Sequence, residues 1–89
     1  MLQPIFYVKY LGENTFSLEN GHIYAVVEKE PLAEDLFRMV DETECDYLFT
    51  LTNFEVVQPN EMSELDKKRA DKRVEACNRK ILQYGEGNF

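Results

Sequence analysis

The residue pattern of the chain changes at Pro59, and this break limits what the chain can fold into. Before Pro59, short runs of aromatic and β-branched residues alternate with turn residues, a pattern typical of strands. After it, apolar residues recur three or four positions apart, which is the spacing of one helix face. We therefore expect a mainly β fold over residues 1–60, a helix over about 61–84 and a tail at 85–89, together forming one compact domain.

The region before Pro59 predicts a small antiparallel β-barrel of five to six short strands. Asn20-Gly21 stands between two apolar runs and favours a type I′ hairpin turn, because both residues tolerate positive φ. Closure into a barrel is expected because an open sheet of this size leaves exposed edges. The expected strands are Pro4–Tyr10, Thr15–Leu18, His22–Lys29, Leu36–Val40, Cys45–Leu51 and Phe54–Val57.

The region after Pro59 predicts one long amphipathic helix. Asn60 or Ser63 can cap its start, with Asp66 three residues after Ser63, and Gly85 is a stop signal. At 1.5 Å per residue such a helix is roughly 35 Å long, which exceeds the width of so small a barrel. We expect its polar first half to overhang the barrel, or the helix to meet a second copy. Its apolar stripe consists of Ala70, Val74, Cys77, Ile81 and Tyr84.

Length and composition exclude several classes of protein. The 89 residues carry a formal net charge of -7, a sign that opposes general affinity for nucleic acid or anionic membranes. No apolar run reaches the length of a membrane span and no signal peptide begins the sequence, so we expect a cytoplasmic protein. Cys45 and Cys77 match neither a disulfide framework nor a zinc pattern, which favours reduced, partly buried thiols. With no catalytic, metal or cofactor signature, we expect no enzyme and no cofactor.

The positive charge is concentrated after Pro59. Residues 1–60 carry three basic and eleven acidic side chains, whereas residues 61–89 carry seven basic and six acidic ones. A basic run on the predicted helix can bind nucleic acid or an acidic partner, can be a solvated surface, or can dock onto the acidic barrel of its own or a second chain. The basic run consists of Lys67, Lys68, Arg69, Lys72 and Arg73.

Acidic residues gather around the turns of the predicted barrel. One cluster holds Asp41, Glu42, Glu44 and Asp46. Carboxylate oxygens suit a hard cation such as calcium, although the cluster lacks the spacing of an EF-hand. With Glu28, Glu30, Glu34 and Asp35 it can form a negative face that imitates nucleic acid, or a surface that keeps the protein soluble. We interpret His22, the only histidine, as a solvated strand residue.

Several segments between Asn20 and Val57 resemble an SH3-like barrel. Gly21–Val27 is similar to the strand after the first long loop of that fold, and Leu36–Asp41 to the next strand. Tyr47–Phe49 and Thr52–Val57 resemble its closing passage. The chain also resembles small uncharacterised bacterial and phage SH3-like proteins, over roughly residues 4–58.

This resemblance implies a barrel but not a standard polyproline groove. Peptide-binding SH3 domains hold their ligand on an aromatic platform that includes a tryptophan and a proline. The chain has no tryptophan, and Phe49-Thr50-Leu51 stands where that proline is expected. The aromatic residues that remain as candidates for a partner-binding surface are Tyr7, Tyr10, Tyr47 and Phe54.

Together these features favour a non-enzymatic protein-interaction module that docks a partner through aromatic residues ringed by charge. One alternative is an acidic inhibitor, carried by a phage or mobile element, that mimics nucleic acid. Another is a nucleic-acid-binding accessory protein that uses the basic run. We expect a protein partner and no membrane, with a homodimer through the helix as a further arrangement.

Overall fold

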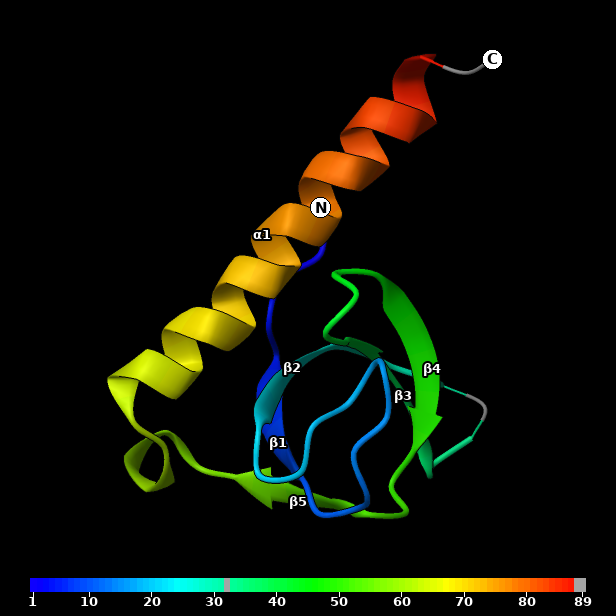
Figure 1. Ribbon diagram of the computed structural model, residues 1–89. Coiled ribbons are helices and arrows are strands. Elements are labelled where there is room, and N and C mark those ends of the chain that lie inside the picture. The colour runs from blue at the N-terminus through cyan, green and yellow to red at the C-terminus, as the bar shows by residue number, and fades with distance from the viewer. Residues whose placement is uncertain (32, 88–89) are drawn as a thin grey trace.

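The fold is a five-stranded antiparallel sheet followed by one long C-terminal helix (Figure 1). The computed structural model describes residues 1–31 and 33–87. The strands occur in the sheet in the order β4-β3-β2-β1-β5. The elements are β1 Phe6–Tyr10, β2 Ile23–Lys29, β3 Leu36–Val40, β4 Asp46–Thr50, β5 Phe54–Val57, a 3₁₀ turn at Pro59–Glu61 and the helix α1 Glu64–Gly87.

The segment between β1 and β2 is a long loop rather than a strand with a tight hairpin. The expected strand Thr15–Leu18 is wrong, because its backbone closes on itself: the Thr15 amide donates to the Leu18 carbonyl at 2.8 Å. The type I′ turn is also wrong, since Gly21 alone of the Asn20-Gly21 pair has a positive φ, of 84°. β2 pairs instead with β1, with Tyr7 opposite Ala25.

The sheet curls strongly but does not close, so the expectation of a closed barrel goes further than the structure does. β4 and β5 are its two edges, and they approach each other through side chains. The rings of Phe49 and Phe54 lie 5.9 Å apart, centroid to centroid. Within the described residues these edges share no backbone ladder. Aromatic packing, and not a backbone ladder, therefore connects the end of β4 to the start of β5.

Both faces of the sheet are covered, which gives two small cores. β2 shows this most clearly, because its residues alternate between the two faces and five in succession are buried. One core lies inside the curl of the sheet and consists of Val8, Tyr10, Leu18, Tyr24, Val26, Phe37 and Met39. The other lies under α1 and consists of Ile23, Ala25, Val27, Val40, Val57, Ala70, Val74 and Cys77.

The helix α1 begins at Glu64 rather than at about residue 61, directly after the expected cap Ser63, and it extends further than expected. Ser63 accepts a hydrogen bond from the Asp66 amide at 3.1 Å and so caps the first turn. Gly85 does not stop the helix, which continues to Gly87, since one helical glycine costs only about 1 kcal/mol. The side chain of Tyr84, expected on the apolar stripe, lies outside the described residues. No helix in the described part of the chain is both long and apolar enough to cross a membrane.

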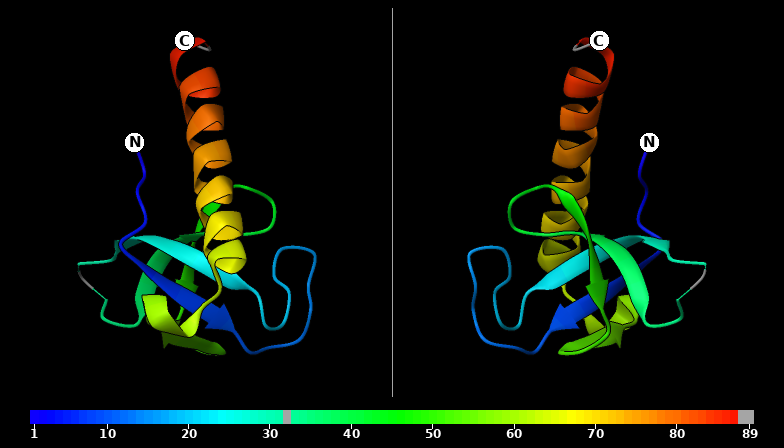
Figure 2. Two further views of the ribbon diagram at one scale, coloured as in Figure 1. Left: turned by 90° about the vertical axis from the view of Figure 1, so that its left-hand side faces the viewer. Right: turned by 90° about the vertical axis from the view of Figure 1, so that its right-hand side faces the viewer.

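The middle of α1, not its end, packs on the sheet. Ala70, Val74 and Cys77 are at most 3% exposed, and the helix contacts β2 and β3. Beyond Cys77 the described side chains of Ile81 and Leu82 are 43% and 45% exposed. The final turns therefore extend past the sheet (Figures 1 and 2). Only the first turns of the basic half of α1 overhang the sheet as expected. Arg73, later in that half, is buried between α1 and the sheet.

Candidate docking groove beside the C-terminal helix

The aromatic residues proposed as a binding surface do not form one surface. Tyr10 and Phe54 lie inside the curl of the sheet, with ring centroids 5.3 Å apart. Tyr7 faces α1 from the opposite side of β1. Tyr47 is 52% exposed on the edge strand β4. Since successive strand residues point to opposite faces, the side chains of Tyr7 and Tyr10 lie on opposite faces of β1.

The basic run is likewise divided by the fold. Lys68, Arg69 and Lys72 are exposed. Lys67 is paired with Asp71 one turn later, at 2.8 Å. Arg73 is only 9% exposed and contacts β2 and the turn after β3. Two of the five cations therefore already have carboxylate partners within the chain.

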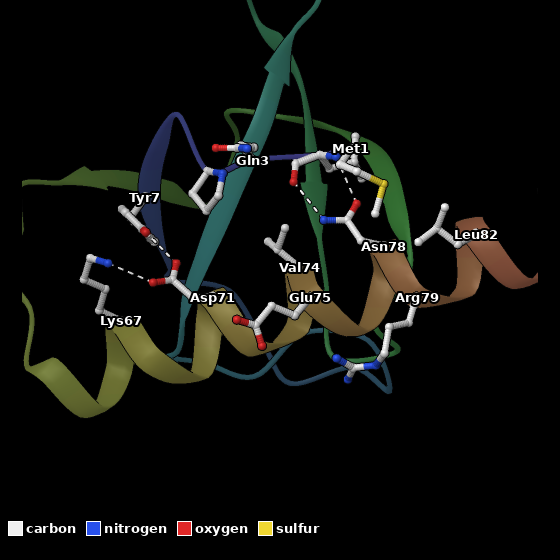
Figure 3. Close-up of a pocket in the computed structure, with 12 residues that line it drawn as sticks. Met1, Gln3, Tyr7, Lys67, Asp71, Val74, Glu75, Asn78, Arg79 and Leu82 are labelled. Carbon is white, nitrogen blue, oxygen red and sulfur yellow. Dashed lines mark hydrogen bonds and ion pairs between the residues drawn. The ribbon is translucent and has the colours of Figure 1, made fainter.

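A groove of about 650 Å³ lies between α1 and the residues that precede β1 (Figure 3). Its apolar wall combines Leu2 and Pro4 from the start of the chain with Val74 and Leu82 from the helix. Polar side chains stand along the helix side at intervals of three or four residues, so that they share one face. These polar residues are Lys67, Asp71, Glu75, Asn78 and Arg79.

Asn78 fixes the N-terminal side of the groove. Its Oδ1 accepts a hydrogen bond from the Leu2 amide, and its Nδ2 donates one to the Leu2 carbonyl, each at 2.9 Å. One side-chain amide thus satisfies both backbone groups of one residue, as a neighbouring strand would do. The first residues of the chain are held in place on α1 by this pair of bonds.

At the other end of the groove, Tyr7 and Lys67 meet at Asp71. The Tyr7 hydroxyl donates to Asp71 Oδ1 at 2.5 Å, and Lys67 Nζ lies 2.8 Å from Oδ2. Lys67 also lies over the Tyr7 ring, 5.6 Å from its centroid. Burial and the neighbouring carboxylate raise the pKa of Tyr7. The Asp71 hydrogen bond and charge raise the pKa of Lys67, so the lysine stays charged.

A second polar cluster lies on the sheet side of α1 and centres on Glu42. Glu42 Oε2 accepts hydrogen bonds from Tyr24 at 2.6 Å and Arg73 at 3.2 Å, and lies 2.8 Å from His22 Nδ1. Burial acts to raise the pKa of Glu42, but these hydrogen bonds and the Arg73 charge outweigh it and hold the pKa below its ordinary value. Burial and the bond to Glu42 raise the pKa of Tyr24. The cluster joins β2, the β3–β4 turn and α1.

Three side chains of this region have a spacing that suits a metal ion. Ligand atoms of Glu19, His22 and Glu42 lie within 4.8 Å of one another. However, the shared oxygen of Glu42 already contacts the Arg73 guanidinium, and a cation there would be repelled by that charge. This arrangement fits an internal ion-pair network better than a metal site.

The acidic residues do not form one cluster. Glu34 and Asp35 precede β3, whereas the 41–46 group follows it, and five extended residues separate the two groups by roughly 17 Å. Several of these carboxylates also have partners in the chain. The pairs are Glu28 and Asp46 with Arg38, Glu42 with Arg73, and Glu44 with Lys80.

The two cysteines are free thiols, as the sequence indicates, but they differ in environment. Cys77 is 2% exposed. Burial, with the nearby Asp46 carboxylate, raises its pKa to about 11. Cys45 is only partly buried and directly precedes β4. A protonated, buried Cys77 is a packing residue of the core under α1.

Comparison of the chain with family models, curated proteins and solved structures finds no match.

Two important groove residues, Asn78 and Leu82, did not stand out in the sequence. Asn78 lies beside the apolar stripe and looks like an ordinary solvated helix residue until Leu2 is placed against it. Leu82 falls one position after Ile81, off the stripe, on the face that also carries Asn78. The one available signal was this second, weaker line of residues along the helix.

Proposed function

We propose that this chain is a non-enzymatic protein-interaction module that works in the cytoplasm and binds a protein partner in the groove beside α1. The observation that carries the proposal is the continuity between this groove and the free end of the helix. Leu82 lines the groove and is also 45% exposed beyond the sheet. Met1, at the same end of the groove, is 71% exposed.

The chemistry of the groove suits a peptide segment better than a small polar metabolite. An apolar floor ringed by charged side chains is the usual composition of a protein interface. Val74 and Leu82 provide the apolar contacts, while Glu75 and Arg79 offer one charge of each sign at the rim. A partner would gain affinity from the apolar contacts and orientation from the two charges.

Ion pairing within the chain counts against both nucleic-acid alternatives. A helix that binds nucleic acid through basic side chains needs free cations along one line, yet Lys67 and Arg73 are paired with carboxylates inside the chain. A nucleic-acid mimic needs free acids, yet several of the acids are paired with arginines within the chain. The protein-binding proposal needs neither set of charges to be free.

The SH3-like resemblance, which covers roughly residues 4–58, also stays a proposal. Five short antiparallel strands that curl around one aromatic core support it. The open ladder between β4 and β5 is the point at which the sheet departs from a closed barrel.

The test is partner capture with two variants that carry the same charge change at adjacent helix positions. Leu82→Asp places a carboxylate in the groove, whereas Gln83→Asp places one at an exposed position that does not line the groove, about 100° further around the helix. We expect the wild-type chain and Gln83→Asp to retain the same proteins and Leu82→Asp to lose them, with added DNA displacing none. Equal retention by both variants would refute the groove, and displacement by DNA would favour the mimic.

A further inference from the structure

The edge strand β4 exposes an unusual amount of apolar side chain. Tyr47 is 52% and Leu48 46% exposed, and Leu51, directly after the strand, is 43% exposed. In the described residues β4 has one strand neighbour, β3, and its other side is the edge of the sheet. In the right-hand view of Figure 2 this strand faces the viewer.

The hydrogen bonds at the two ends of β4 show which backbone groups face this open side. The Asp41 amide donates to the Cys45 carbonyl at 3.2 Å, and the Leu51 amide donates to the Asp35 carbonyl at 3.1 Å. In an antiparallel ladder such bonded pairs alternate with unbonded ones. The odd-numbered residues from 45 to 51 therefore bond to β3, and the N–H and C=O groups of Asp46, Leu48 and Thr50 point outward.

β4 lacks the devices that usually keep an edge strand from pairing. Such strands often carry lysine, proline or a bulge, and residues 46–51 contain neither lysine nor proline. The register with β3 is regular throughout. The only charge, on Asp46, is already engaged by Arg38 at 3.1 Å. The other edge strand, β5, carries the exposed Glu55 and is followed by Pro59.

We propose that two copies of this chain pair edge to edge through β4, antiparallel, with Leu48 on the two-fold axis. Outward-facing residues then meet outward-facing residues: Leu48 is opposite Leu48 of the second copy, and Asp46 is opposite Thr50 of the second copy. Each of these pairs can exchange two backbone hydrogen bonds. Only an extended strand can pair with backbone N–H and C=O groups spaced in this way, and β4 of a second copy presents its own N–H and C=O groups at the same spacing.

The side chains and charges of β4 agree with this register. Tyr47 comes opposite Phe49 of the second copy on one face, and the two Leu48 side chains meet on the other, so both faces gain apolar contact. The single carboxylate of the strand lies opposite a neutral threonine, which avoids a like-charge pair. Each copy carries a net charge of -7, so added salt should strengthen the association by screening their repulsion.

The first test is the oligomeric state of the wild-type chain and two variants by sedimentation equilibrium over a range of protein and salt concentrations. Leu48→Lys places two cations opposite each other, and Val56→Lys is the matched control on β5, where Val56 is 48% exposed. We expect a wild-type dimer that tightens with salt, a dissociation constant raised at least about tenfold by Leu48→Lys, and little change from Val56→Lys. A monomer at every concentration would overturn the proposal. It would do so even if a peptide from another protein binds this edge.

A second measurement uses the wild-type chain alone and does not depend on how a variant folds. We expect the amide hydrogens of Asp46, Leu48 and Thr50 to exchange quickly in dilute protein and slowly in concentrated protein. Those of Tyr47 and Phe49, bonded to β3, should be protected in both. A dimer that leaves the three outward amides unprotected, as pairing through α1 would, rules out the β4 edge.

Discussion

Arg73 and Glu42 join the middle of α1 to the turn between β3 and β4, with Arg73 Nη2 3.2 Å from Glu42 Oε2. The same guanidinium donates to the Ile23 carbonyl at 2.9 Å and lies over the Tyr24 ring, 4.8 Å from its centroid. A residue that the sequence places in a basic, potentially ligand-binding run is thus fully engaged within the fold.

Replacing Arg73 with methionine should destabilise the chain by about 3 kcal/mol, because it leaves a partly buried carboxylate and a backbone carbonyl without their donor. Lys72→Met is the control, since Lys72 is exposed, and it should change the free energy of unfolding by no more than about 0.5 kcal/mol. Urea denaturation measures both. Equal effects of the two substitutions would show that Arg73 is not structurally special.

The hydrogen bonds of Glu42 should make the stability of the fold depend on pH in the acidic range. The pKa of Glu42 lies below its ordinary value of 4.5 in the folded chain, so ionised Glu42 stabilises the fold above that value. This stabilisation is lost as the pH falls through the folded pKa. Glu42→Gln should therefore be less stable than the wild type at neutral pH, with the difference shrinking in acid. Urea midpoints across this range would contradict the assignment if the two curves stayed parallel.

The thiols of Cys45 and Cys77 should react with a disulfide reagent at very different rates. Cys77 is almost fully buried and its pKa is raised to about 11, so at about pH 8 it is neither exposed nor ionised. We expect Cys45 to react first and Cys77 only when denaturant opens the core. The Cys45→Ser variant isolates the slow thiol, and rapid labelling of that variant in native buffer would contradict the packing.

Asn78→Ala should release the start of the chain from α1. Two hydrogen bonds to Leu2 are lost, which should cost about 1–2 kcal/mol and expose residues 1–4 to proteolysis. Arg79→Ala, at the next and exposed position, should leave the cleavage pattern unchanged. Resistance of the Asn78→Ala chain to an aminopeptidase at wild-type level would show that other contacts hold the segment.

The sequence predicts local elements well and their long-range partners poorly. β3 and β5 have the expected bounds, and the Ser63 cap could be identified, because these depend on neighbouring residues. The pairing of β1 with β2 across the loop 11–22 could not be identified, since an Asn-Gly pair offers a plausible local alternative. The groove could be predicted only in part for the same reason. The sequence indicates Tyr7 and Lys67 as candidates, but it does not indicate the contact between Leu2 and Asn78, which are hydrogen-bonded across 76 positions.

The long sequence separation between α1 and the residues that it contacts also sets an order for folding during synthesis. The helix is anchored by bonds to residues made much earlier, such as Ile23, 50 positions before Arg73, and Tyr7, 64 positions before Asp71. All five strands precede the helix. A sheet that forms before α1 has left the ribosome has one face bare, and Ile23, Ala25 and Val27 stay in water until α1 packs on them. That interval is when the chain is most open to aggregation or to capture by a chaperone.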